Sequence, residues 1–213
     1  MTTWGNAVDS DLDLDHAWHP VARSADLVEG GWVQVRLLGR TWTVQRSGGA
    51  PGAEPPAWGV DEQHGLVWLA PAEPHGPRLE VPEAHDPRFA AAWLPPVRSG
   101  APAAALADAL RTGPAEEPGR RVTTVVQEPF QLRRRVEDPV TGTVRTLHVV
   151  LQPEDDDSTN VHARLLLRTE VPPTADDVAA EVAAAREQLA ATLALPAPPA
   201  PNTVAPLAAP VPA

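Results

Sequence analysis

The chain has 213 residues, a formal net charge of −11 and a hydrophobic content of 43%, which is enough for a globular core. It contains no cysteine, tyrosine or lysine, so all 17 of its positive charges are arginines. These absences exclude thiolate nucleophiles, Schiff-base lysines, disulfides and thiolate-held metal clusters, and the negative balance argues against nucleic acid or an anionic membrane as a partner.

The start of the chain and its longest apolar runs bear on its location. No basic stretch followed by an apolar run opens the sequence, as it would in a secretory signal. No segment reaches the roughly 18 consecutive apolar residues of a membrane span. We therefore expect a cytoplasmic protein that is not inserted in a membrane.

Two stretches in the first half show the alternation of a β-strand. Apolar and polar side chains alternate in residues 33–37 and again in residues 41–45, with a turn at Gly39 between them. This pattern predicts a β-hairpin. A third strand is predicted at residues 66–69, after a turn formed by His64 and Gly65.

The remainder of the first half lacks such alternation. Residues 47–56 are rich in glycine, proline and alanine and are expected to form a loop. Residues 71–98 are dense in proline, and we expect them to run as an extended, irregular cover over the hairpin. All seven tryptophans lie at or before Trp93, so the aromatic packing should belong to this half.

The second half is predicted to contain a short helix at residues 101–111 and then a run of strands. Short, turn-rich connections join these strands, which favours an antiparallel meander. The predicted strands are residues 122–126, 130–136, 143–152 and 161–167.

The last predicted element is a helix over residues 175–195. Thr174 followed by Asp177 resembles a capping box, and Pro196 ends the helix. One face of this helix is apolar and consists of Val178, Val182, Ala185, Leu189 and Leu193. The remaining residues, 196–213, are mostly proline and alanine and are expected to be disordered.

Four segments, WHPVA at 18–22, GLVWLA at 65–70, LPPVR at 94–98 and LQPEDD at 151–156, carry a family resemblance. In this order they resemble the alpha subunits of Rieske non-haem iron oxygenases of the aromatic ring-hydroxylating or demethylating type. The resemblance implies an α+β, mainly β fold, in which a small β domain precedes a helix-grip domain with a sheet and a long C-terminal helix. The domains it implies are a flexible leader (1–15), a degenerate Rieske-like domain (16–98), a partial helix-grip domain (99–195) and a disordered tail (196–213).

The resemblance also implies an Fe2S2 cluster, whose ligands are missing from this sequence. The family supplies them as Cys-x-His and Cys-x-x-His motifs between the hairpin and the strand at residue 66. In this chain residues 47–65 contain no cysteine and a single histidine, His64. The cluster-binding loops are therefore predicted to be deleted, which makes the chain an internally truncated relative.

The second metal centre that the family implies is a mononuclear iron. Its histidines belong to an Asp-x-x-His-x-x-x-x-His run, but here no histidine follows Asp108 until His148. The position of its carboxylate on the last helix is taken by Ala190, Ala191 or Thr192. We therefore predict no metal ligands, no cofactor and no catalytic residues of the family.

The histidines offer alternative sites. His16 and His19 form a possible metal pair, against which we weigh a packing or capping role for His19. His64, His75 and His85 form a possible zinc site, against which we weigh three solvent-facing loop residues. In both cases the structural role is favoured. For His16 and His19 the reason is that no carboxylate or third ligand stands at a convincing spacing, and for the other three that they lie near prolines and glycines in predicted loops.

Two further clusters lie on predicted strands. His148 and His162 are expected on strands that are neighbours across the turn at residues 154–157. A general base in the cavity of the sheet is weighed against a core or edge role, and the core or edge role is favoured. In the run Arg133-Arg134-Arg135, Arg134 should face opposite to its neighbours. We expect the arginines of this run to pair with acidic side chains of the chain, which are in excess, rather than to bind a partner.

The preferred functional hypothesis is a non-catalytic accessory subunit that pairs with a full-length Rieske oxygenase or with itself. Sheet edges left exposed by the deletions would favour such a protein partner. The alternative is a metal-free small-molecule-binding protein, or a cyclase or isomerase that uses the helix-grip cavity to position its substrate. A third possibility is a decaying gene product with little activity.

Overall fold

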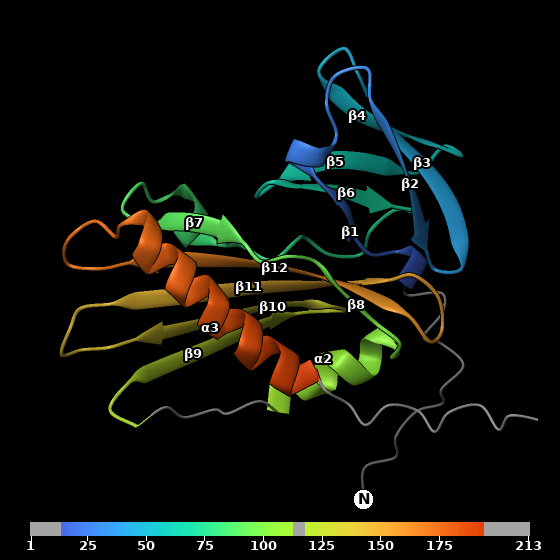
Figure 1. Ribbon diagram of the computed structural model, residues 1–213. Helices are drawn as coiled ribbons and strands as arrows, with labels where there is room; N and C mark the ends of the chain where they lie inside the picture. Colours follow the sequence, from blue (N-terminus) through green and yellow to red (C-terminus); the bar gives the residue numbers. More distant parts are fainter. Residues whose placement is uncertain (1–13, 113–117, 194–213) are drawn as a thin grey trace, which may run out of the picture.

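The structure, a computed structural model, describes residues 14–112 and 118–193. The described chain is mostly β, with two α-helices, and belongs to the α+β class (Figure 1). The expected tail (196–213) lies outside the described residues, as does most of the expected leader (1–15). Neither of the two helices is long and apolar enough to cross a membrane.

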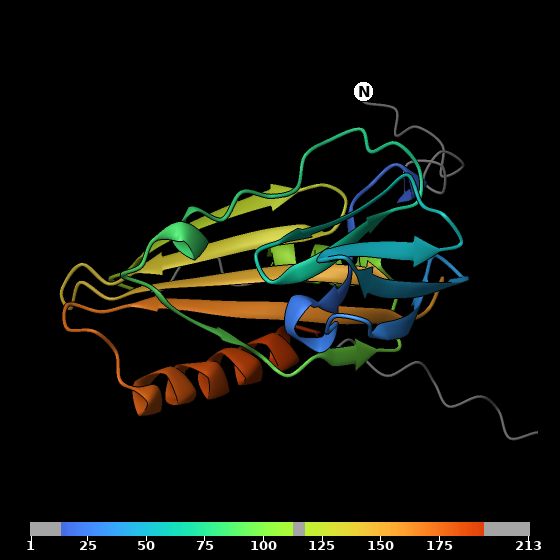
Figure 2. The ribbon, with the colours of Figure 1, turned by 90° about the horizontal axis from the view of Figure 1, so that it is seen from above.

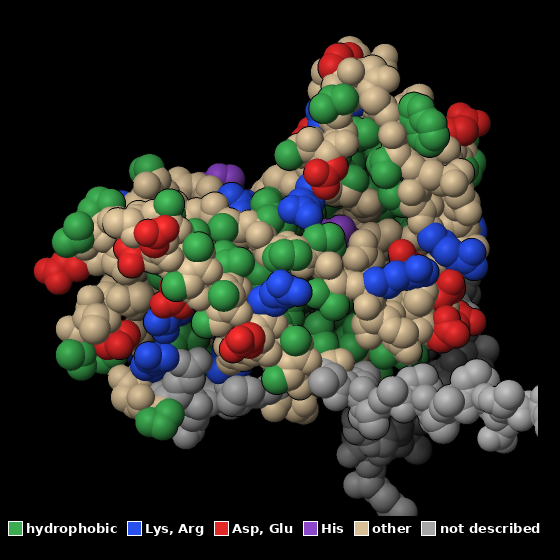
Figure 3. Space-filling model, in the orientation of Figure 1, with side chains coloured by type: hydrophobic (Ala, Val, Ile, Leu, Met, Phe, Trp, Pro, Cys, Tyr) green, Lys and Arg blue, Asp and Glu red, His purple; other side chains and the backbone are tan. Residues whose placement is uncertain are grey.

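Two small antiparallel sheets form the first half and rise as a lobe above one end of a larger sheet (Figures 1 and 3). Their strand orders are β1-β6-β5 and β2-β3-β4, and they share one hydrophobic core. The strands are β1 (His19–Arg23), β2 (Trp32–Leu37), β3 (Arg40–Ser47), β4 (Ala50–Glu54), β5 (Gly59–Gln63) and β6 (Leu66–Ala70).

The predicted hairpin and the predicted third strand are confirmed as β2–β3 and β6. The expected loop at residues 47–56 is wrong, because it contains β4, which pairs with β3. Gly48 and Gly49 have φ angles of 65° and 82°, a turn that returns the chain directly onto β3. The ladder is made of backbone hydrogen bonds, so it forms although this segment lacks a strand-like side-chain pattern.

The second half forms a six-stranded sheet (Figure 2). The predicted meander is confirmed, since β9, β10, β11 and β12 pair consecutively and antiparallel. The order is β7-β12-β11-β10-β9, and β8 also pairs with β12. The strands are β7 (Ala90–Trp93), β8 (Val97–Ser99), β9 (Arg121–Gln127), β10 (Gln131–Glu137), β11 (Val144–Pro153) and β12 (Thr159–Arg168).

The irregular cover expected for residues 71–98 is wrong in its last third. β7 and β8 are short strands that pair with β12 and so extend the large sheet. Pro95 and Pro96 stand between them, and because proline cannot donate to a ladder they split this edge into two pieces. A turn of 3-10 helix at Pro82–His85 precedes these strands.

The helices α2 (Ala103–Thr112) and α3 (Ala175–Leu193) cover one face of the large sheet, and the small sheets pack on part of the other face. Val149 and Leu151 of β11 point to the helices, whereas Val150 between them packs with Trp68 of β6. The sheet is therefore the middle layer of the molecule. Of the predicted final helix, Ala194 and Leu195 lie outside the described residues.

The predicted capping box of α3 is confirmed. Asp177 Oδ2 accepts hydrogen bonds from the backbone N–H and the hydroxyl of Thr174 at 2.9 and 2.7 Å. In return, the backbone N–H of Asp177 donates to Thr174 Oγ1 at 3.2 Å. These hydrogen bonds lower the pKa of the Asp177 carboxyl, so the cap is made by the ionised side chain.

Candidate functional site

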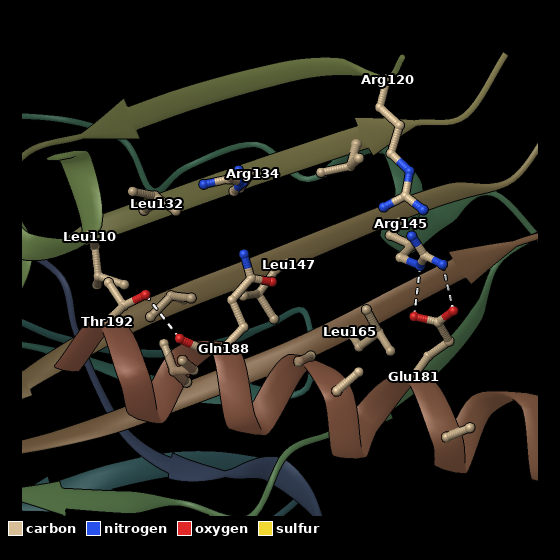
Figure 4. A pocket seen from close by; sticks show the side chains of 16 residues that line it. Leu110, Arg120, Leu132, Arg134, Arg145, Leu147, Leu165, Glu181, Gln188 and Thr192 are labelled. Atoms are coloured by element: carbon tan, nitrogen blue, oxygen red, sulfur yellow. Dashed lines mark hydrogen bonds and ion pairs between the residues drawn. The ribbon is translucent and has the colours of Figure 1, made fainter. Parts of the chain in front are cut away.

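A cavity of about 370 Å³ lies between α3 and the large sheet (Figure 4). Its floor and walls are mainly aliphatic, and both the sheet and the helix contribute. The apolar lining residues are Leu110 of α2, Leu132 and Val136 of β10, Leu147 and Val149 of β11, Leu165 of β12, and Ala180, Ala184, Ala185 and Leu189 of α3. The alanines among the α3 lining residues leave space between the helix and this part of the sheet.

Charged side chains enter the cavity from its sheet side and its helix side. Arg145 of β11 pairs with Glu181 of α3, where Nη2 donates to Oε1 at 2.7 Å and Nε lies 2.6 Å from Oε2. Arg120, in the turn before β9, also lines the cavity, and its Nε lies 3.8 Å from Asp138 Oδ2. Figure 4 shows Arg120 directed toward the Arg145–Glu181 pair.

Arg134 is the third arginine of the lining and sits between Leu132 and Val136 on the same face of β10. Its neighbours point to the opposite face, as the strand period predicts. Arg133 Nη1 donates to the Glu80 carbonyl at 2.8 Å, and Arg135 Nε lies 3.5 Å from Glu83 Oε1. The expected facing of Arg134 is confirmed, and the expected pairing with an acidic residue is confirmed for Arg133 and Arg135, which both lie near the Glu83 carboxylate.

The lining carries three arginines against a single carboxylate, that of Glu181. It includes no histidine, and the carboxylate is held in an ion pair. A general base is therefore not in place among these residues. What the arrangement offers is an apolar volume with guanidinium groups at its edge, which suits binding and orientation of a small molecule.

The core role favoured for His148 and His162 is confirmed, since both are buried, whereas the alternative in which both rings point into this cavity is wrong. They lie on the neighbouring strands β11 and β12, as predicted, and Val150, which is paired with His162, shares their face. That face packs against β6 of the small sheets. Leu147 and Val149, which flank His148 in sequence, line the cavity instead.

His148 belongs to a buried junction between the large sheet and the turn before β6. The ring centroid of His64 lies 5.2 Å from that of His85 and 6.2 Å from that of His148. Burial lowers the pKa of His148 to about 3, and burial together with the nearby His85 lowers the pKa of His64. Arg164 Nη1 donates to the His64 carbonyl at 2.9 Å and ties the two layers together.

The remaining histidines have structural partners. His16 stacks on His75 with ring centroids 4.3 Å apart, so His75 is not grouped with His64 and His85. His19 is buried, forms a 2.7 Å hydrogen bond with the Leu14 carbonyl, and has a pKa lowered to about 4 by burial. Within residues 14–112 and 118–193, no three His, Cys, Asp or Glu side chains are placed to hold a metal ion.

Comparison with solved structures identifies the architecture. NdmA of Pseudomonas putida CBB5, in a mutant form with theobromine, superposes with a TM-score of 0.70 at 14% identity, covering 95% of this chain and 88% of NdmA. NdmB of the same organism gives 0.66 at 11%, covering 85% and 82%. Dicamba monooxygenase bound to dicamba gives 0.56 at 10%, covering 72% and 78%.

The chain has the fold of the Rieske non-haem iron oxygenases. No protein-family model and no curated protein matches the sequence. At identities of 10–14% the likeness concerns the fold, so whether the Rieske oxygenase metal centres fit this chain must be tested on its own residues.

The Fe2S2 cluster of this fold does not fit the chain. A Rieske centre takes two thiolates on one iron and two imidazoles on the other. The sequence contains no cysteine at any of its 213 positions. His64, the histidine nearest to the expected place, has a buried ring beside two other imidazoles and no thiolate.

A mononuclear iron of the family type does not fit the described residues either. It requires two histidines and a carboxylate around one point. Glu181 is the one carboxylate of the cavity lining, and no histidine accompanies it. On α3 the positions expected for the acid are Ala190, Ala191 and Thr192, and the Thr192 hydroxyl donates to the Gln188 carbonyl at 2.9 Å.

Sequence reasoning missed most of the charged cavity residues. Arg134 was singled out by strand alternation, but Arg145 and Glu181 are 36 positions apart and no local pattern links them. The sequence does show an acidic residue, Glu181, next to the apolar face of the helix that carries Val182 and Ala185. Only the packing of the helix on the sheet shows that Glu181 lines a cavity and pairs with Arg145.

Proposed function

We propose that the chain is a non-catalytic accessory subunit of a full-length Rieske oxygenase in the cytoplasm. In this proposal it is internally shortened and consists of a degenerate Rieske-like domain (16–98) and a partial helix-grip domain (99–195). The observation that carries the proposal is the combination of an oxygenase fold along most of the chain with a sequence that has no cysteine. Such a chain offers the shape of an oxygenase subunit without an electron-entry site.

Exposed apolar groups on edge strands support a protein partner. β2 is an edge strand of its small sheet, and its first residue, Trp32, is 69% exposed. β9 forms one edge of the large sheet and carries Val126, which is 38% exposed. Edges of this kind present unpaired backbone groups that a second chain can satisfy.

The test is co-expression with a full-length Rieske oxygenase encoded near this chain, followed by native mass spectrometry and iron analysis of the same sample. We expect a hetero-oligomer whose iron content matches the number of full-length subunits. Trp32→Glu should weaken the complex, whereas Trp58→Glu, a change at another exposed tryptophan, should not. A chain that stays separate from its relative under these conditions contradicts the proposal.

The cavity favours a second candidate function, a metal-free protein that binds a small molecule or acts as a cyclase or isomerase by positioning alone. A ligand that binds only the folded chain raises its melting temperature, and the rise grows with the logarithm of the ratio of ligand concentration to Kd. We expect such a rise with small aromatic compounds for the isolated chain. An unchanged melting temperature across a panel of aromatic and polyketide-like compounds argues against this function.

A further inference from the structure

We propose that the cleft between the small sheets and the large sheet binds a small neutral molecule with an O–H or N–H group, such as a phenol or an azole, which donates a hydrogen bond to His162 Nδ1. The cleft has a volume of about 280 Å³ and lies where β1 and β2 meet the end of β11 and the start of β12 (Figure 1). It shares no lining residue with the cavity under α3, and the inference goes beyond both functions proposed above.

The walls of the cleft are held together by hydrogen bonds between the two layers. The backbone N–H of Leu38, in the turn between β2 and β3, donates to the Pro153 carbonyl at 2.9 Å. The side-chain Nε2 of Gln152 donates to the Arg36 carbonyl, also at 2.9 Å. Because these bonds join β2 to the end of β11, the cleft is preformed, and a ligand does not have to open it.

The hydrogen bonds of Gln152 fix which nitrogen of His162 carries the proton. Since the amide nitrogen of Gln152 donates to the Arg36 carbonyl, its Oε1 is the acceptor, and this oxygen lies 3.0 Å from His162 Nε2. Nε2 must therefore donate, and Nδ1 keeps its lone pair. Burial, together with the nearby Arg23, lowers the pKa of His162 to about 4, so the ring stays neutral near pH 7.

His162 Nδ1 is an unused acceptor on a buried side chain. The residue is 6% exposed and lines the cleft. Nδ1 has no hydrogen-bond partner among the described residues and, unlike both ring nitrogens of His64, it is not enclosed by protein, so it is reached from the cleft. Water can donate to this nitrogen, but a ligand that donates to it also covers the apolar walls and gains their burial.

The walls select a small apolar body. β1 and β2 line the cleft with Val21, Ala22, Val33 and Val35. The volume of about 280 Å³ is just below that of sites for drug-sized molecules, roughly 300–1,000 Å³, and an apolar cavity of about 150 Å³ already holds benzene. A molecule with one ring therefore fits with its polar group at His162.

The charges beside the cleft favour a neutral ligand. Each charged side chain of the lining has a partner of opposite sign within 3.5 Å. The pairs are Arg23–Asp26, Arg36–Asp155 and Arg98–Glu154, at 3.5, 3.0 and 2.6 Å. The lining itself holds two arginines and two carboxylates, so an ionic ligand would lose hydration without meeting a surplus of the opposite charge.

Probes that share one fluorinated ring test the inference in fluorine NMR titrations of the full chain. 4-Fluorophenol donates a hydrogen bond, 4-fluorotoluene has a methyl group in place of the hydroxyl, and 4-fluorobenzoate carries a negative charge. We expect 4-fluorophenol to bind about fivefold to tenfold tighter than either of the other two, the range of one hydrogen bond.

Variants locate the binding. His162→Phe keeps a ring but removes the acceptor, and it should make the affinities for 4-fluorophenol and 4-fluorotoluene equal. His148→Phe, a change at a buried histidine outside the cleft, should keep the preference for the phenol. Pro96→Trp should fill the cleft and abolish binding of the phenol, whereas Pro95→Trp, at the neighbouring exposed position outside the lining, should not.

Several outcomes overturn the inference. Equal affinity of the unchanged chain for the phenol and for either other probe does so, as does a preference for the phenol that survives in His162→Phe. Absence of binding, or binding that is as tight in Pro96→Trp as in Pro95→Trp, rules out the cleft as the site. Because the proline pair tests the location on its own, the result does not depend on folding of the His162 variant. None of these results decides the subunit proposal, which is tested by co-expression.

Discussion

At the residue scale, Trp68 joins the layers of the molecule. Its side chain is completely buried in β6, and its Nε1 donates to the Gln63 carbonyl at 3.1 Å. It packs with Leu66 and with Val150 of the large sheet, while the guanidinium carbon of Arg78 lies 5.9 Å from the centre of its ring. One side chain therefore links the small sheets to the middle layer.

Trp68→Ala should lower the free energy of unfolding by roughly 3–5 kcal/mol, the usual cost of removing a buried aromatic side chain. Urea denaturation followed by far-UV circular dichroism measures the change. Trp32→Ala is the matched control, because Trp32 is 69% exposed and its removal leaves no cavity. Equal effects of the two changes would contradict the role assigned to Trp68.

Glu181 is the one carboxylate among the cavity-lining residues, and its ion pair with Arg145 joins α3 to β11. Glu181→Gln removes this charge and should lower the free energy of unfolding by up to about 1 kcal/mol, the range of a partly exposed ion pair. Urea denaturation measures the change. Glu187→Gln, an exposed change on the same helix, should leave the stability as it was.

At the scale of elements, α3 is held to the molecule by few contacts. Among its 19 residues only Leu189 and Leu193 are buried, and Val182 and Ala185 pack on the same core from partly exposed positions. The N-terminal half of the helix is held by its cap, by the Arg145–Glu181 pair and by the partly exposed Val182. A helix anchored mainly at one end suits a cavity wall that admits a ligand.

Thr174→Ala removes the two hydrogen bonds that the Thr174 hydroxyl makes with Asp177 in the capping box. The change should lower the free energy of unfolding by about 1 kcal/mol. The loss should be largest in hydrogen-exchange protection of the first turns of α3, and smaller in global stability. Thr192→Ala is the control, because its hydroxyl donates to the Gln188 carbonyl one turn earlier in the same helix. An equal loss of hydrogen-exchange protection along the whole sheet would contradict a local role of the cap at the start of α3.

At the scale of the whole molecule, the two halves of the chain meet through buried neutral histidines. His148 faces the turn before β6, and His162 lies on the same sheet face with its Nε2 3.0 Å from Gln152 Oε1. Burial lowers the pKa of His162 to about 4, as it does for His19 in β1. Folding therefore keeps these rings unprotonated in mildly acidic solution.

Stability should fall as the pH is lowered from 7.5 to 5.5. In the unfolded chain a histidine takes up its proton near pH 6.5, whereas in the folded chain His19, His148 and His162 do so only at about 4, 3 and 4. Each ring then favours the unfolded state by about 1.4 kcal/mol at pH 5.5, so the three together cost roughly 4 kcal/mol. The contribution is complete above pH 6.5 and is lost toward the folded pKa values.

Urea unfolding at several pH values measures this slope. His148→Phe keeps a ring at the junction but removes one titrating group, so the dependence between pH 7.5 and 5.5 should decrease by about a third. His75→Phe is the matched control, because His75 stacks on His16 and shows no such burial. If stability depends on pH equally in the unchanged chain, in His148→Phe and in His75→Phe, the assignment of this dependence to the buried histidines is contradicted.

The sequence by itself determined the strands whose side chains alternate, the capping box at Thr174 and the facing of Arg134. It also determined that thiolate chemistry is excluded, because composition does not depend on folding. These features are local, since side-chain period and helix capping are set by residues a few positions apart.

Only the tertiary structure decided the pairing of β4, β7 and β8, the direction of His148 and His162, and the cavity itself. β7 meets β12 through backbone hydrogen bonds between segments some seventy residues apart, which no side-chain pattern specifies. Alternation separates the two faces of β11, but the docking of α3 on one face and of the small sheets on the other decides which residues face a cavity. Burial makes the same histidines neutral core groups and excludes the alternative of a general base in the cavity.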